Sequence, residues 1–229
     1  MAFTRTPPPG NVRRVVCLGR NLRGVLTNKR GHVVQFESAL EHTLVLLLER
    51  DASVADYRSQ PEVLNFRDAA ARPRTYTPDF QVWRTDGRIE LHEVTVESRR
   101  AHRVTLRERE AAAIAICKER DWRYIVHTDQ TLPSGAMYAN LVFLAPYRSS
   151  VHADAAAWWL ERLRDQGPRH PAAMLDGVTP VAMAGRLLNG LYHLLWHAVV
   201  QMDWQRPLVA RGAFDPAARI WLAAQVVAP

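Results

Sequence analysis

The chain has 229 residues, 48% of them hydrophobic, which suits one medium-sized domain or one domain with a small second one. Its formal net charge of +7 favours a polyanionic partner, most often nucleic acid. The longest apolar run, residues 44–48, is too short to cross a membrane. The N-terminus lacks an apolar signal segment. The two cysteines, Cys17 and Cys117, are too far apart in the sequence to form a metal-binding motif. We therefore expect a cytoplasmic protein.

Residues 1–30 are predicted to form a basic, proline-rich arm. Residues 1–36 contain no Asp or Glu, so the positive charge at this end of the chain is not balanced locally. We expect the arm to contact DNA phosphates, with a solvated tail as the alternative. The candidate DNA-binding residues are Arg13, Arg14, Arg20, Arg23, Lys29 and Arg30.

Residues 31–148 are predicted to form the main α/β domain. The predicted elements are a helix at 38–49, short strands at 54–57 and 63–66, a hairpin of strands 80–83 and 89–95, a helix at 104–120 and a strand at 124–127. The hairpin is expected to turn at Asp86 and Gly87. Residues 140–144 fit either a strand or the end of a helix.

Residues 149–229 are predicted to form a small helical domain. Helices are expected at 153–164, 172–175 and about 181–202, followed by a run of alternating polar and apolar residues near the end. Helices followed by a hairpin-like tail suggest a winged-helix-like module.

Two acidic residues at the ends of the predicted hairpin indicate a metal site. Asp79 follows Pro78 and begins one strand, and Glu93 lies late in the next strand. In an antiparallel hairpin these positions can face each other. Two carboxylates and the backbone carbonyl of Val94 would give Mg²⁺ the hard oxygen ligands that it prefers, and Mn²⁺ is expected to substitute. Such a site can polarise a phosphodiester and activate a water.

Each of these acidic residues also has a purely structural interpretation. Asp79 can cap the turn after Pro78, and Glu93 can be an ordinary residue at the end of a strand. Glu41 lies three residues after Ser38 and can close a capping box at the start of its helix. A glutamate bonded to its own helix terminus is less available to a metal, so the two roles of Glu41 compete.

The order and spacing of several short segments resemble the TnsA family. The segments are FESALEHTLVLLLERDASVADYRSQP, YTPDFQVW, HEVT and WRYIVHTD, and the resemblance spans about residues 31–130. TnsA proteins are the endonuclease subunits of heteromeric cut-and-paste transposases and belong to the PD-(D/E)xK nuclease superfamily. The segment LLNGLYHLLWHAVVQMDWQRPL is similar, less distinctively, to the second domain of that family.

The resemblance implies a fold, a reaction and partners. The fold would be a restriction-endonuclease-like core, with a mixed central sheet flanked by helices. Glu41, Asp79 and Glu93 match the metal-binding and catalytic acids of the family. A protein of this kind cuts the 5′ ends of a transposon while a separate transposase cuts the 3′ ends. An ATPase regulator would dock on the C-terminal domain.

Position 95 departs from the family pattern. The family has a lysine two residues after the strand acid, and this chain has Thr95, which carries no charge. Lys29, in the arm, and Lys118, at the far end of a helix, are poorly placed to replace it. Three arginines that follow the strand could approach the site instead, although an arginine stays protonated and cannot act as a base. They are Arg99, Arg100 and Arg103.

Three functional hypotheses follow. The first is a Mg²⁺-dependent DNA endonuclease subunit with Glu41, Asp79, Glu93 and Thr95 in its catalytic site. The second, favoured by Thr95, is a weakened or inactive subunit that binds DNA and assembles the transposition complex without cutting. The third is a stand-alone restriction or repair nuclease of the same superfamily.

Overall fold

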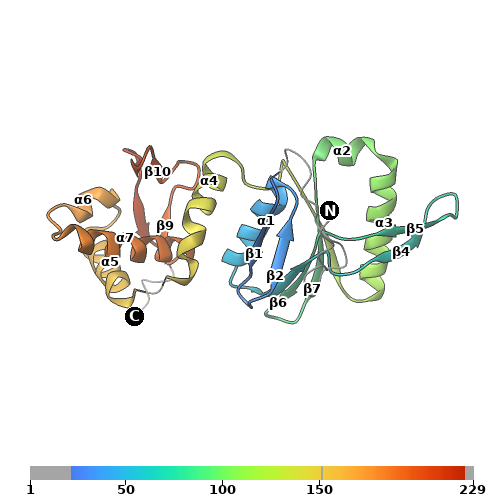
Figure 1. Cartoon of the computed structure of the whole chain (residues 1–229), viewed down its shortest axis with the longest axis horizontal. Coiled ribbons are helices and arrows are strands. Elements are labelled where there is room, and N and C mark those ends of the chain that lie inside the picture. The colour runs from blue at the N-terminus through green and yellow to red at the C-terminus, as the bar shows by residue number, and fades with distance from the viewer. Residues whose placement is uncertain (1–21, 151, 225–229) are drawn as a thin grey trace, which may run out of the picture. The chain divides into compact units, whose positions relative to one another are not determined.

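The structure, a computed structural model, describes residues 22–150 and 152–224 (Figure 1). The chain forms two compact units that divide between Leu132 and Pro133. This division precedes the predicted boundary at residue 148. The reason is that helix α4 (Gly135–Leu144) packs against α7 (Val181–Trp196) of the second unit.

A four-stranded mixed sheet forms the centre of the first unit, in the order β3–β6–β7–β8. The strands are β3 (Val54–Ser59), β6 (Phe80–Arg84), β7 (Ile89–Thr95) and β8 (Arg123–Thr128). The pairs β3–β6 and β6–β7 are antiparallel, and β7–β8 is parallel. Gly87 provides the positive φ, 87°, that the tight turn between β6 and β7 requires. All four strands overlap strands predicted from the sequence.

Helices cover both faces of this sheet, with α1 (Ala39–Arg50) on one face and α3 (Val104–Glu119) on the other (Figure 1). Successive strand residues alternate between the two faces, which gives two separate apolar clusters. The cluster at α1 comprises Val34, Leu44, Val45, Leu48, Val54, Tyr57, Phe80, Val82 and Leu132. The cluster at α3 comprises Leu64, Tyr76, Leu91, Ala113 and Cys117. The first unit is thus a mixed α/β fold with a sheet flanked by helices.

Two short hairpins complete the first unit, together with α2 (Glu97–His102). They are β1 (Gly24–Thr27) with β2 (Val33–Phe36) and β4 (Leu64–Arg67) with β5 (Pro73–Tyr76). The prediction of an arm through residue 30 was therefore wrong at its C-terminal end, because β1 pairs with β2 and is part of the domain. Strands β1, β2 and β5 have four residues each, too few for a periodic pattern to stand out.

The second unit is mainly helical, with two small strand pairs. Its elements are α4 (Gly135–Leu144), η1 (Ala145–Ser149), α5 (Ala153–Gln166), α6 (Pro171–Leu175), α7 (Val181–Trp196), β9 (Val200–Met202), β10 (Val209–Ala210), β11 (Ala213–Phe214) and β12 (Ile220–Leu222). Residues 140–144 belong to a helix. The prediction of one helix over 181–202 was wrong beyond Trp196, because the chain turns at Ala198 (φ 59°) and β9 pairs with β12.

Close packing of α5 against α7 holds this unit together. A Cβ atom on Gly190 would lie 2.6 Å from the Cβ atom of Ala155, so only glycine fits there. The buried indole of Trp159 donates a hydrogen bond to the carbonyl oxygen of Leu187, at 2.7 Å. In the described part of the chain, no helix has the length and apolar character needed to cross a membrane.

Candidate active site

The β6–β7 hairpin brings Asp79 and Glu93 together. Asp79 lies immediately before β6, and the pairing of Phe80 with His92 places Glu93 beside it. The Asp79 Oδ2 atom accepts a hydrogen bond from the Val94 N–H group at 2.8 Å. The charge of Glu93 raises the pKa of Asp79, so the two carboxyl groups lie close together. The structure therefore places the two predicted hairpin acids side by side.

The end of β3 fixes the backbone at Asp79. The Gln60 N–H group donates to the Asp79 carbonyl oxygen at 2.7 Å, and the Gln60 side chain donates to Glu37 Oε1 at 3.0 Å. Gln60 adopts φ 46°, a left-handed conformation that turns the chain before Pro61. The turn at this Gln-Pro step thus positions one of the acids.

Ser38 caps α1 as predicted, and Glu41 completes a variant of the predicted capping box. Its N–H group donates to Ser38 Oγ at 3.1 Å, and its carboxylate accepts from the Ser38 hydroxyl and from the Glu37 N–H group, at 3.0 and 2.8 Å. The Glu41 charge nevertheless raises the pKa of Asp79 and that of Glu93. The cap is confirmed, and metal binding by Glu41 stays a prediction.

The acidic site is electrostatically unbalanced. Burial raises the pKa of the Asp79 carboxyl well above its ordinary value, and the charges of Glu93 and Glu41 raise it further. Burial likewise raises the pKa of Glu93, although the hydrogen bond from Tyr76 partly opposes the rise. Carboxylates brought together in this way repel one another, and a bound cation would relieve that repulsion.

Sequence reasoning missed two tyrosines beside Glu93, one of which binds it directly. The Tyr76 hydroxyl donates to Glu93 Oε2, and the hydroxyl groups of Tyr76 and Tyr124 lie 3.0 Å apart. Tyr76 ends β5, and Tyr124 lies in β8. The signal available in the sequence was a tyrosine three residues before Asp79. Its role stayed hidden because β5 was not predicted.

A small cavity of about 20 Å³ lies beside Glu93 and Thr95. Its lining comprises Glu93, Thr95, Arg100, Leu106, Arg109, Glu110, Tyr124 and Val126. Of the three arginines considered from the sequence, only Arg100 lines it, and Arg100 forms an ion pair with Glu110 at 2.6 Å. Arg109, from α3, was not predicted from the sequence, and its charge acts on Glu93.

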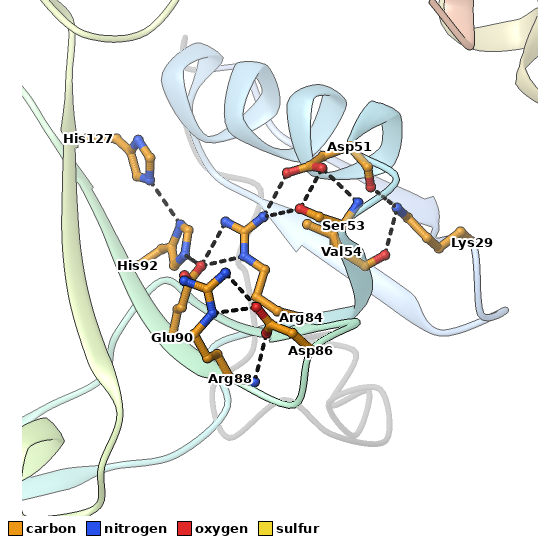
Figure 2. Close-up of polar contacts among 10 residues, drawn as sticks. All are labelled: Lys29, Asp51, Ser53, Val54, Arg84, Asp86, Arg88, Glu90, His92 and His127. Atoms are coloured by element: carbon orange, nitrogen blue, oxygen red, sulfur yellow. Dashed lines mark hydrogen bonds and ion pairs between the residues drawn. The ribbon is translucent and has the colours of Figure 1, made fainter. Parts of the chain in front are cut away.

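The lysines do not replace the missing motif residue. Lys29 Nζ donates to the carbonyl oxygens of Asp51 and Val54, at 2.8 and 3.0 Å (Figure 2). Lys118 is exposed in the last turn of α3. The prediction that neither lysine supplies the site agrees with these positions.

The residues at the site fit Mg²⁺ in their donor chemistry. Within residues 22–150 and 152–224, no group of three or more His, Cys, Asp or Glu side chains is arranged so that it could hold a metal ion. Asp79 and Glu93 supply two adjacent carboxylates, and Mg²⁺ is usually bound by one or two carboxylates while it keeps several waters. Gln60, whose backbone N–H group binds the Asp79 carbonyl oxygen, also has a buried Oε1 atom without a hydrogen-bond partner among the described residues.

The predicted DNA-binding arm is only partly described. Arg13, Arg14 and Arg20 lie outside the described residues. Arg23 is half-buried, and Arg30 Nε donates to the Ala55 carbonyl oxygen at 3.1 Å. Lys29 and Arg30 therefore help to hold β1 and β2 against the domain. DNA binding by the six predicted residues stays a prediction.

A separate polar cluster lies on the α1 face of the same sheet (Figure 2). Arg84 forms ion pairs with Glu90 and Asp51, each at 2.7 Å. His92 Nε2 lies 3.0 Å from Glu90 Oε2, and His92 Nδ1 lies 2.9 Å from His127 Nε2. The hydrogen bond with His92 and the Arg84 charge lower the pKa of Glu90 to about 2, although burial opposes them. Because strand residues alternate between faces, His92 faces away from Glu93.

The comparison with known families agrees with this geometry. Residues 51–129 match the family described as TnsA-like endonuclease N terminal. The matched segment extends from before β3 to beyond β8 and contains Asp79, Glu93, Thr95 and Arg109, whereas Glu41 lies before it. No curated protein matches the chain. The sequence motifs, the paired acids and the family match agree: residues 51–129 are similar to the N-terminal domain of TnsA-like endonucleases.

Proposed function

We propose that this protein is a Mg²⁺-dependent DNA endonuclease subunit that cuts the 5′ ends of a transposon alongside a separate transposase. The observation that carries the proposal is the proximity of Asp79 and Glu93 at the end of the β6–β7 hairpin, within reach of the Glu41 charge. Acids held close together lower the stability of a fold, and such sites occur where function requires them.

The chain's own residues have distinct roles in this reaction. Asp79 and Glu93 would hold Mg²⁺, with the Val94 carbonyl as a third ligand and Glu41 assisting. When bound, the ion supplies charge that polarises the scissile phosphate and favours ionisation of a water. Tyr76 orients the Glu93 carboxylate through its hydroxyl, and Gln60 holds the Asp79 backbone in place. The basic arm would grip the DNA backbone.

A non-catalytic assembly subunit is the alternative, and Thr95 is the observation that favours it. A threonine cannot supply the charge that the family lysine supplies. Such a subunit would bind DNA ends and protein partners without cutting. In either case we expect an ATPase regulator to bind the second unit, for which a winged-helix-like fold remains our prediction.

The catalytic proposal is tested with Asp79→Ala. We expect wild-type protein to bind Mn²⁺ in a calorimetric titration and Asp79→Ala to lose that binding. Together with the partner transposase, the wild type should yield simple insertions, whereas Asp79→Ala should yield products in which the 5′ strands stay joined to the donor DNA.

Asp165→Ala is the matched control, because Asp165 is an exposed aspartate in α5 of the other unit. It should behave as the wild type in both measurements. An unchanged ratio of products for Asp79→Ala would refute the catalytic proposal and support the assembly alternative. Cleavage of DNA by the chain without any transposase would instead support a stand-alone nuclease.

A further inference from the structure

The helix α3 presents an arginine to the place where the family lysine would act. Arg109, Ala113 and Cys117 are spaced by four residues and therefore lie on one face of α3. Ala113 and Cys117 are buried in the cluster with Leu91 of β7. Arg109 lies on the same helix face, one turn before Ala113. Glu93 lies on the same strand face as Leu91, two residues later, and Arg109 and Glu93 line the same cavity.

Thr95 leaves room for this arginine. Thr95 and Glu93 lie on the same face of β7, and both line the small cavity together with Arg109. A threonine side chain is shorter than a lysine side chain and therefore takes up less of this cavity of about 20 Å³. The cation missing from position 95 is thus matched by a cation from α3 at the same cavity.

Arg109 is also the cation at this cavity that remains available. The guanidinium of Arg100 is held by two hydrogen bonds to Glu110, at 2.6 and 3.0 Å. No ion pair holds Arg109 among the residues that the structure describes, and its side chain is exposed to solvent. Its charge acts on Glu93 in the direction opposite to burial. A guanidinium in this position can donate hydrogen bonds to a phosphate that enters from solvent.

We propose that Arg109 replaces the motif lysine and contacts the scissile phosphate, stabilising the negative charge that develops during cleavage. This inference rests on the proposed endonuclease function. Arginine keeps its proton, so Arg109 would supply charge and two hydrogen bonds but would not accept a proton from the attacking water. The attacking water would lose its proton to solvent or to a carboxylate of the acidic site.

The test measures 5′-strand cleavage at transposon ends, with Mn²⁺, the partner transposase and a plasmid that carries the ends. Arg109→Ala should reduce the cleavage rate by about 10²–10³, the usual effect of removing one electrostatic stabiliser. Arg107→Ala is the control, because Arg107 is an exposed arginine on the same helix outside this cavity. It should cleave at the wild-type rate.

The double variant Thr95→Lys/Arg109→Ala separates a catalytic role from a structural one. If Arg109 occupies the functional position of the lysine, this variant should regain most of the lost rate. Mn²⁺ binding, measured by calorimetry without DNA, should persist in Arg109→Ala because the carboxylates are intact. Loss of Mn²⁺ binding in Arg109→Ala would show that Arg109 only supports the metal site, which would overturn the inference.

Two further outcomes distinguish this inference from the proposed function. If Asp79→Ala abolishes cleavage while Arg109→Ala retains the wild-type rate, the endonuclease function stands and the role of Arg109 is refuted. If wild type and Asp79→Ala are equally inactive with the transposase present, the endonuclease function is refuted, and the catalytic role of Arg109 is refuted with it.

Discussion

At the scale of single residues, Glu41 and Ser38 serve the helix and the acidic site at the same time. Ser38 Oγ accepts from the Glu41 N–H group, which the start of α1 would otherwise leave without a partner, and the Glu41 carboxylate accepts from the Ser38 hydroxyl and the Glu37 N–H group. The same bonds hold the Glu41 carboxylate near Asp79 and Glu93, whose pKa values it raises. The structural and functional interpretations of Glu41, which compete in the sequence, are thus compatible in their geometry.

Ser38→Ala should lower the free energy of unfolding by about 1 kcal/mol, the usual cost of removing an N-cap side chain. The Glu37 N–H group would still hold Glu41, so the loss should stay close to that of the cap alone. Urea denaturation measures the change, with the exposed Ser98→Ala as the control. If Ser38→Ala unfolds at the same urea concentration as the wild type, the cap contributes nothing to stability.

At the scale of elements, strand β7 separates two polar systems by its alternation. Glu93 and Thr95 face α3 and the acidic site, whereas Glu90 and His92 face α1, where Glu90 binds both Arg84 and His92 (Figure 2). The Glu90 pKa is lowered from 4.5 to about 2. The stability that the ionised Glu90 carboxylate contributes to the fold is therefore fully present above pH 4.5 and is lost as the pH falls toward 2.

Arg84→Leu should destabilise the protein by about 3 kcal/mol, because it leaves the buried Glu90 carboxylate without its main cation. The Glu90 side chain is only 5% exposed, and that of Arg84 is 17% exposed. Arg88→Leu, which breaks the half-exposed pair with Asp86, should cost at most about 1 kcal/mol. Chemical denaturation at pH 7 measures the free energy of unfolding of both variants. Equal losses of stability would show that burial does not make the Arg84–Glu90 pair more important than the exposed pair.

At the scale of the whole molecule, positive charge is unevenly distributed. The net charge is +7, and residues 1–36 contribute only cations. The described cations of this region are partly used inside the fold, since Lys29 and Arg30 bind backbone carbonyls. If the region grips DNA, Arg13, Arg14 and Arg20 are therefore expected to carry most of the effect.

Replacing Arg13, Arg14 and Arg20 with Gln should weaken DNA binding and make it less dependent on salt. Three lost phosphate contacts should reduce the slope of log K against log salt by about 2.7. Fluorescence anisotropy of a labelled duplex over a KCl series measures the slope. The matched control replaces Arg88, Lys118 and Arg120, which lie in the β6–β7 turn and at the end of α3, away from Asp79 and Glu93. Identical slopes for the two triple variants would exclude a specific role for the arm.

The sequence by itself determined the parts of this protein that depend on local patterns. Alternation and the Asp-Gly turn predicted the β6–β7 hairpin, and the hairpin places Asp79 beside Glu93. The spacing of Ser38 and Glu41 predicted the capping box. These features arise within short segments, where residue spacing and turn chemistry decide which groups meet.

Tertiary structure alone decided which other groups reach Glu93. Tyr76, Tyr124 and Arg109 come from β5, β8 and α3, and no local period relates them to β7. Tertiary packing also decided that α7 ends at Trp196, where pairing of β9 with β12 replaces further helical turns. It likewise decided that α4 belongs to the second unit. Contacts of this kind form when separate elements bury their apolar faces against each other, which is a property of the assembled fold.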